Sequence, residues 1–192
     1  LIWLGTRKGI SIYDTKTKKI TNLEQYFKFK QIPKLDGYRI YSILEDYKGN
    51  VWVGTTNGLN RFNMNDLTVN SFKSVYTDTL SLFDNQIISL MGDKDGFIWI
   101  GTKAGLNRFD YKTNKFFRIG SPREGQFYAG KNKYYQISNS YVEEILEDYI
   151  DGSIWIGTAS GLNRYDKRTG TFQYFTVKEG LPNETIYDLK QD

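Results

Sequence analysis

The chain has 192 residues, a formal net charge of +4 and 39% hydrophobic residues, and it contains neither cysteine nor histidine. The missing cysteine excludes disulfides and thiolate metal sites, and the missing histidine removes the commonest general base and metal ligand. The positive charge is spread without a long basic run, so we expect no nucleic-acid partner. No apolar run approaches the roughly 20 residues of a membrane helix, and we expect no direct membrane contact in this segment.

One stretch of the chain recurs four times. Its clearest copy, residues 51–63, reads VWVGTTNGLNRFN, and related copies begin at residues 2, 98 and 154. Each copy contains one tryptophan, and neighbouring tryptophans are about 50 residues apart. A period of this length, with strand-like segments and no helical pattern inside it, is typical of a β-propeller blade.

Each unit divides into four short strands, which we name A to D from the inside of the propeller to its rim. Strand A is residues 40–46, and a turn that opens with Asp46 and contains Gly49 leads to strand B, the tryptophan segment. Strand B is apolar on both faces, which suits a strand between two neighbouring blades. Strand C is residues 58–62, and strand D carries aromatic residues such as Phe72.

The sequence therefore predicts an all-β chain, a β-propeller segment of four four-stranded blades over residues 1–192. Along the chain, the predicted strands come in the order B-C-D, then A-B-C-D three times, then a final A. Either residues 184–192 complete the first blade and close a four-blade ring, or the blades are an arc or fragment of a larger propeller, which we favour. The expected blades are residues 1–30, 38–76, 85–120 and 140–177.

Two recurring residue types are expected to be structural. The tryptophans lie in the middle of apolar segments, so we expect them to pack between blades. An arginine that follows an asparagine in strand C recurs with them, as expected for a hydrogen bond repeated in each blade. These structural residues are Trp3, Trp52, Trp99, Trp155, Arg61, Arg108 and Arg164.

No metal or cofactor site is expected. The turn Asp93-Lys94-Asp95-Gly96 has two acids of a calcium-binding loop, but Ala104 stands where the bidentate glutamate should come. The pattern therefore predicts an ordinary turn.

Candidate ligand-binding residues lie in the loops of one face. In a propeller the B–C and D–A connections emerge on the same side, and in this chain both vary between copies while the strands hardly change. The longest D–A connection is residues 120–140. These loops offer polar donors and aromatic planes, although the residues could equally be solvated, and the long connection could pack on a neighbouring domain. The candidates are Arg7, Asn57, Lys103, Arg123, Gln126, Phe127, Tyr128, Lys133, Tyr134 and Tyr135.

The repeated string W-(I/V)-G-T-x-x-G-L-N-R-(F/Y)-(D/N), preceded by I-L-E-D-x-x-G, closely resembles the two-component regulator propeller repeat. Residues 179–186 resemble the blade-to-blade connector of that family, whereas the first copy departs from it with Ser11 and Ile12. The resemblance implies a periplasmic or extracellular sensor region of a bacterial two-component receptor. It further implies that the ligand is an oligosaccharide.

Three functions are consistent with the sequence. The leading one is a non-enzymatic, ligand-sensing propeller segment whose ligand is a carbohydrate. The second is a structural or dimerisation scaffold without a small-molecule ligand, and the third is a polysaccharide-active enzyme. An arc has two exposed blade faces, so we expect self-association or contact with neighbouring propeller blades, for example two arcs in an eight-blade ring.

Overall fold

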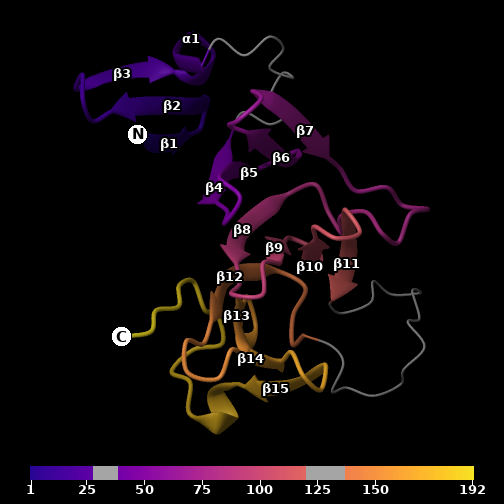
Figure 1. Ribbon diagram of the computed structural model, residues 1–192. Helices are drawn as coiled ribbons and strands as arrows, with labels where there is room; N and C mark the ends of the chain where they lie inside the picture. The colour runs from indigo at the N-terminus through magenta and orange to yellow at the C-terminus, as the bar shows by residue number, and fades with distance from the viewer. Residues whose placement is uncertain (28–38, 120–136) are drawn as a thin grey trace.

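The computed structural model describes residues 1–27, 39–119 and 137–192, which form an all-β fold. The strands form four antiparallel sheets that follow one another along an arc (Figure 1). Each sheet uses strands that are consecutive in the chain; the first has three strands and the others have four. This arrangement confirms the predicted β-propeller class. No helix among the described residues is long and apolar enough to cross a membrane.

The sheets are meanders with short connections. The first contains β1 (Ile2–Thr6), β2 (Gly9–Asp14) and β3 (Lys19–Asn22), followed by the short helix α1 (Leu23–Phe27). The second contains β4 (Ile40–Glu45), β5 (Asn50–Thr55), β6 (Gly58–Asn63) and β7 (Thr68–Phe72). The third contains β8 (Ile87–Gly92), β9 (Ile98–Thr102), β10 (Gly105–Asp110) and β11 (Lys115–Ile119). The fourth contains β12 (Val142–Glu147), β13 (Ile154–Thr158), β14 (Gly161–Asp166) and β15 (Thr171–Phe175), followed by the 3₁₀ turn η2 (Val177–Glu179).

The strand register repeats from sheet to sheet. In every four-stranded sheet the tryptophan of the second strand lies opposite the arginine of the third. The pairs are Trp52 with Arg61, Trp99 with Arg108 and Trp155 with Arg164. In the first sheet Ile12 takes the place of the arginine opposite Trp3. The sequence repeat is thus also a repeat of backbone pairing.

The hydrophobic core lies between neighbouring sheets. Trp52 is fully buried, and its ring lies 5.0 Å from that of Phe109 in the third sheet. The flanking valine Val53 points the other way and packs with Ile12 of the first sheet. Because successive strand residues face opposite sides, one strand fills two interfaces. Trp155 belongs to the last sheet and is only half-buried.

Residues 184–192 do not join any sheet. They lie against the fourth sheet, where the backbone N–H of Ile186 donates to the carbonyl of Thr158 at 3.0 Å. They do not pair with β1, at the other end of the arc, whose inner edge is paired with none of the residues that the structure describes (Figure 1). The described residues therefore form an open arc and not a closed four-blade ring.

Candidate functional site

The two sets of variable loops lie on one face, and hydrogen bonds join them. The N–H of Gly58, in the turn between β5 and β6, donates to the carbonyl of Asn85 at 2.6 Å, and Asn85 belongs to the connection that leads to β8. The equivalent bond in the fourth sheet runs from Gly161 to Glu184, also at 2.6 Å. In the second and fourth sheets, the turn between the second and third strands is therefore fixed against the connection that follows the sheet.

The predicted ligand contacts fall into two groups. Arg7, Asn57 and Lys103 are exposed and lie in equivalent turns of three successive sheets. The structure does not gather them into one pocket. The remaining candidates lie outside the described residues, within 120–136. They are Arg123, Gln126, Phe127, Tyr128, Lys133, Tyr134 and Tyr135.

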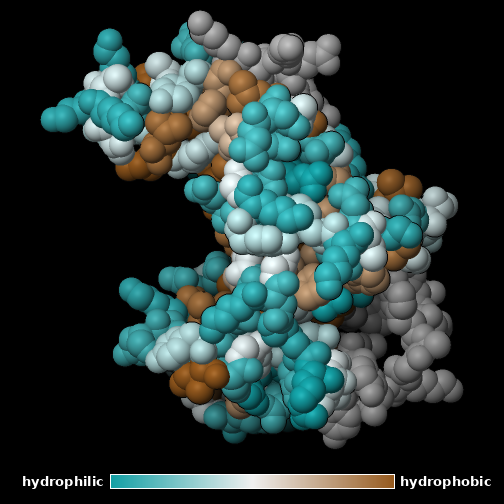
Figure 2. Space-filling view, viewed as in Figure 1, coloured by the Kyte–Doolittle hydropathy of each residue, from teal (hydrophilic) through white to brown (hydrophobic). Residues whose placement is uncertain are grey.

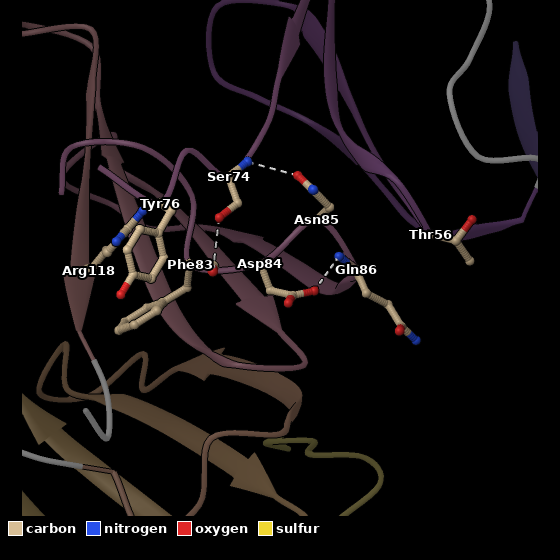
Figure 3. A pocket seen from close by; sticks show the side chains of 8 residues that line it. All are labelled: Thr56, Ser74, Tyr76, Phe83, Asp84, Asn85, Gln86 and Arg118. Carbon is tan, nitrogen blue, oxygen red and sulfur yellow. Dashed lines mark hydrogen bonds between the residues drawn. The ribbon is translucent and has the colours of Figure 1, made fainter. Parts of the chain in front are cut away.

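The loop face contains a cleft between the second and third sheets (Figure 3). Its volume is about 400 Å³. Tyr76, Phe83 and Arg118 lie together at one side of it, and Thr56 and Gln86 at the other. The lining residues are Thr56, Ser74, Tyr76, Phe83, Asp84, Asn85, Gln86 and Arg118. All but two belong to the β7–β8 connection, residues 73–86.

Internal hydrogen bonds fix the shape of this connection. The N–H of Ser74 donates to Asn85 Oδ1 at 2.8 Å, which joins the two ends of the loop. The N–H of Gln86 donates to Asp84 Oδ1 at 2.7 Å. The third sheet holds the middle of the loop, because Asn107 Oδ1 accepts from the N–H of Phe83 at 2.9 Å. The cleft wall is thus preorganised, which reduces the entropy lost on binding.

Arg118 fastens the same loop to β11 and is not a free cation. Its guanidinium donates to the carbonyl of Ser81 at 3.0 Å, to Ser81 Oγ at 2.7 Å and to the carbonyl of Leu82 at 2.8 Å. It also lies 5.4 Å from the ring centre of Phe83. Arg118 therefore positions the cleft wall.

The groups that remain available to a ligand are an aromatic plane and several neutral polar atoms. Tyr76 is 78% exposed, whereas Phe83 is only 3% exposed. Thr56 supplies a hydroxyl, and the amide of Gln86 supplies both a donor and an acceptor. An exposed ring at one side of the cleft and uncharged hydrogen-bonding groups at the other suit a neutral polar molecule that has one apolar face.

The sequence points to this face but not to these residues. The 73–86 connection is polar and short, and nothing in its composition separates Tyr76 from a solvated loop residue. The usable signal is its place in the repeat, since it is a D–A connection. The residues that fold it, Arg118 and Asn107, come from strands of the following sheet.

The repeated asparagines hold backbone at equivalent places. Asn163 Oδ1 accepts from the N–H of Ser138 at 2.7 Å, as Asn107 does from Phe83. Of the arginines next to them, Arg61 and Arg164 donate to the side chain opposite on the fourth strand, to Asn70 Oδ1 and Gln173 Oε1, each at 3.1 Å. Arg164 forms an ion pair with Asp151, whereas Arg108 lies 4.3 Å from the ring centre of Phe97.

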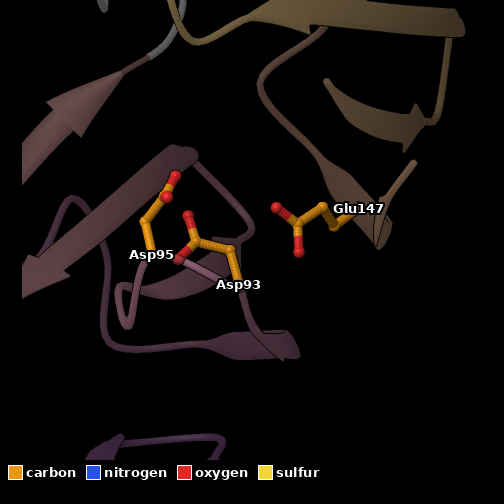
Figure 4. A group of neighbouring side chains, drawn as sticks. All are labelled: Asp93, Asp95 and Glu147. Carbon is orange, nitrogen blue, oxygen red and sulfur yellow. The ribbon is translucent and has the colours of Figure 1, made fainter. Parts of the chain in front are cut away.

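Three carboxylates converge between the third and fourth sheets (Figure 4). They belong to Asp93 and Asp95, in the β8–β9 turn, and to Glu147 at the end of β12. Lys167 Nζ lies 2.6 Å from Asp95, 2.7 Å from Glu147 and 3.6 Å from Asp93. Burial lowers the pKa of Lys167, but the hydrogen bonds to Asp95 and Glu147 outweigh it and the pKa rises above its ordinary value. The cluster is an ion-pair network that already contains its cation.

Two further acids, Glu143 and Glu144 on β12, have perturbed protonation. Burial raises the pKa of both, and the charge of Asp188 adds to the effect on Glu144. A raised carboxyl pKa is one requirement of a general acid. Neither residue lines the cleft on the loop face.

Two segments of the chain match the family model of the two component regulator propeller, residues 34–57 and 81–104. Each contains a predicted strand A and strand B with the turn between them. The extracellular domain of a hybrid two-component system from B. thetaiotaomicron is 26% identical, with a TM-score of 0.67 over 90% of this chain. A second such domain from that organism is 24% identical, with a TM-score of 0.67 over 80% of this chain. These matches confirm the predicted family resemblance.

The likeness to other propellers is one of fold. Virginiamycin B lyase from Staphylococcus aureus is 14% identical, with a TM-score of 0.60 over 92% of this chain and 50% of the lyase. The chain spans only 20% and 21% of the two B. thetaiotaomicron domains. Among curated proteins, no sequence matches this chain.

Proposed function

We propose that this chain, which carries two-component regulator propeller repeats, is a ligand-binding segment of the sensor region of a two-component signalling protein. The repeat match and the two B. thetaiotaomicron domains support the class. Because those domains are extracellular, we place this segment on the periplasmic or extracellular side of the membrane. Signalling by the whole protein would follow from any arrangement of blades that the ligand favours.

The observation that carries the proposal is the cleft on the loop face. It lies where the repeat varies, and a network of hydrogen bonds holds its wall. Its free groups are the ring of Tyr76, the amide of Gln86 and the hydroxyl of Thr56. A carbohydrate fits this chemistry, because its ring has an apolar face that stacks on aromatic planes and hydroxyl groups that bond to amides. We therefore propose a neutral oligosaccharide as the ligand.

We propose binding and not catalysis at this cleft. Among the described residues, Asp84 is the one carboxylate in the lining, whereas glycoside hydrolysis uses two across a cleft. Propellers of this fold do include an enzyme, the S. aureus lyase, and a histidine substitution inactivates that protein. The present chain has no histidine. Its chemistry at the cleft is that of recognition.

The test is saturable binding to neutral oligosaccharides, screened on a glycan array and quantified by calorimetry. Truncating Tyr76 to alanine removes the stacking plane, and we expect affinity to fall roughly tenfold, in line with the energy of an aromatic contact. Gln86→Ala should have a similar effect. Tyr187→Ala is the matched control, since Tyr187 is 76% exposed and does not line the cleft. Equal losses in Tyr76→Ala and Tyr187→Ala, or no saturable binding, would reject the proposal.

A scaffold role is the second candidate, and the unpaired edges support it. Strand β1 has no inner partner among the described residues, and Leu1 and Ile2 are 53% and 49% exposed. Figure 2 shows apolar side chains on the N-terminal sheet, facing the hollow of the arc. We propose that this edge associates with another propeller blade, which a second copy of the chain could supply through residues 184–192.

A further inference from the structure

A second cleft lies on the opposite face, again between the second and third sheets. Its volume is about 370 Å³. It opens among the β4–β5 turn, the end of β6 and the β10–β11 turn. The lining residues are Lys48, Asn50, Arg61, Asn63, Asn65, Tyr111 and Asn114. None of them belongs to the cleft on the loop face.

The repeat gives this cleft an internal comparison, because the next interface carries the acidic network around Lys167. Residues around this cleft have counterparts in the repeat at the next interface. The pairs, with the residue around the cleft first, are Asp46 with Asp93, Lys48 with Asp95, Gly92 with Glu147, Arg61 with Arg108 and Tyr111 with Lys167. At the later interface, Lys167 pairs with three carboxylates. At this one, two cations accompany a single carboxylate. The same backbone position therefore changes from an acidic to a basic environment.

The single carboxylate, Asp46, is already satisfied by neutral donors. It is 7% exposed and accepts a hydrogen bond from Trp52 Nε1 at 2.6 Å and another from the Tyr111 hydroxyl. Asn50 Nδ2 donates to the same group at 3.1 Å. Burial raises the pKa of Asp46, but these hydrogen bonds outweigh it and hold the pKa below its ordinary value. The carboxylate is thus engaged inside the interface.

The two cations keep most of their hydrogen-bonding capacity. Arg61 donates to Asn70 Oδ1 at 3.1 Å, and its guanidinium lies 5.4 Å from the ring centre of Trp52. Lys48 Nζ lies 4.1 Å from the ring centre of Tyr111. Among the described residues, neither cation has a carboxylate within ion-pair distance. The aromatic rings hold both charges at the cleft without neutralising them.

We propose that this cleft binds an oxyanion, namely a sulfate or carboxylate group, between Lys48 and Arg61. A planar guanidinium and an ammonium provide charge-assisted hydrogen bonds to such a group. The exposed amides of Asn65 and Asn114 add neutral donors at the rim. The exposed acid Asp66 accepts from Asn63 Nδ2, which lines the cleft, at 3.2 Å and from the hydroxyl of Thr68 at 2.7 Å.

The test is a titration of the isotopically labelled 192-residue chain with sodium sulfate and, separately, sodium acetate, each against sodium chloride at equal ionic strength. We expect saturable shifts of backbone amides in residues 46–50 and 111–114. Lys48→Asp introduces the residue that the chain itself carries at the equivalent position 95, so the turn should tolerate it. This variant should bind at least roughly tenfold more weakly, as expected for the loss of a charge-assisted bond. Arg61→Gln should act in the same direction.

Lys112→Asp is the matched control, because it makes the same charge change in the β10–β11 turn and Lys112 does not line the cleft. We expect it to leave affinity within about twofold of the unaltered chain, since exposed charges interact weakly. Saturation with sulfate alone would assign the site to tetrahedral anions, and saturation with both would assign it to oxyanions in general. Shifts equal to those in chloride, or equal weakening in Lys48→Asp and Lys112→Asp, would overturn the proposal.

Discussion

Gly157 in β13 lies directly beneath Ile186: a Cβ atom built on this glycine would be 2.7 Å from Ile186 Cγ2. The same relationship joins each earlier sheet to its successor. The other pairs are Gly5 with Ile40, Gly54 with Ile87, and Gly101 with Val142. In those pairs the second residue begins the inner strand of the next sheet. Residues 184–192 therefore occupy the place of an inner strand although they pair with no other strand.

The close contact at these glycines predicts that any side chain introduced in place of the glycine lowers stability by a steric clash. Gly54→Ala would place Cβ 2.6 Å from Ile87 Cγ2, and Ile87 is fully buried. We expect the free energy of unfolding to fall by about 2 kcal/mol, as is usual when a packed core is overfilled. Urea denaturation followed by tryptophan fluorescence measures it. In the control Gly92→Ala the nearest atom is 3.8 Å away, so stability should change by less than about 0.5 kcal/mol. Equal losses in both variants would contradict the steric explanation.

The hydrogen bond from Tyr111 to Asp46 predicts a pH-dependent contribution to stability. Burial, then the hydrogen bond to Asp46, raises the pKa of Tyr111 to about 12. The unfolded chain loses this proton near pH 10 and the folded chain near pH 12, so the contribution is complete below pH 10 and disappears as pH rises to 12. Tyr111→Phe should cost about 2 kcal/mol at pH 7, and this difference should shrink above pH 10.

Chemical denaturation of both proteins between pH 7 and pH 12 tests this prediction. Tyr47→Phe is the control, because Tyr47 is 66% exposed and its loss should change stability at pH 7 by less than about 0.5 kcal/mol. A Tyr111→Phe difference that stays constant to pH 12 would mean that the phenol has no perturbed ionisation.

Removing Lys167, the cation of the acidic network, should destabilise the interface between the third and fourth sheets. Lys167→Met leaves Asp93, Asp95 and Glu147 close together without compensation, and we expect a loss of about 2 kcal/mol at pH 7. The penalty should be full at neutral pH, where the three charged carboxylates repel one another, and disappear when acid protonates them.

Chemical denaturation of the Lys167→Met variant and of the unaltered chain between pH 7 and pH 3 measures how this loss of unfolding free energy depends on pH. Arg168→Met serves as the control, since the Arg168 side chain is 84% exposed and its distance to Asp166 is 3.7 Å. Exposed pairs of this kind contribute little. A Lys167→Met penalty that does not depend on pH would assign the loss to packing and not to charge.

Local alternation was enough to predict the strands and the direction of their side chains. Trp52 and Val53 are neighbours in an apolar strand, so they had to face different sheets, and they do. The contact between the glycine of each tryptophan strand and the position where the next inner strand starts also recurs with the repeat. The two clefts could not be predicted in this way, because their walls combine residues that are distant in the sequence. Arg118 shapes the loop that carries Tyr76, and no spacing in the sequence indicates that contact.

The two ends of the arc are complementary in register, which makes self-association testable. In the second sheet Glu45 lies opposite Val51, and the repeat equates these positions with Gln191 and Ile2. If residues 186–191 of one copy add to β1 of another, the Gln191 side chain should lie opposite Ile2 of the neighbouring copy. Paired strand residues of this kind lie about 5 Å apart between Cα atoms, which a disulfide can span.

The chain contains no cysteine, so the two introduced residues are the only thiols of a Gln191→Cys, Ile2→Cys double variant, and peptide mapping of the dimer identifies which pair is joined. Mild oxidation should give covalent dimers, and sedimentation should show association before oxidation. The register-shifted pair Gln191→Cys, Leu4→Cys should cross-link much less, because its sulfur atoms would be two residues out of line. Equal cross-linking by both pairs would indicate random collision. A strictly monomeric chain at high concentration would show that these edges do not associate with one another, and the complementarity would then reflect only the repetition of the sequence.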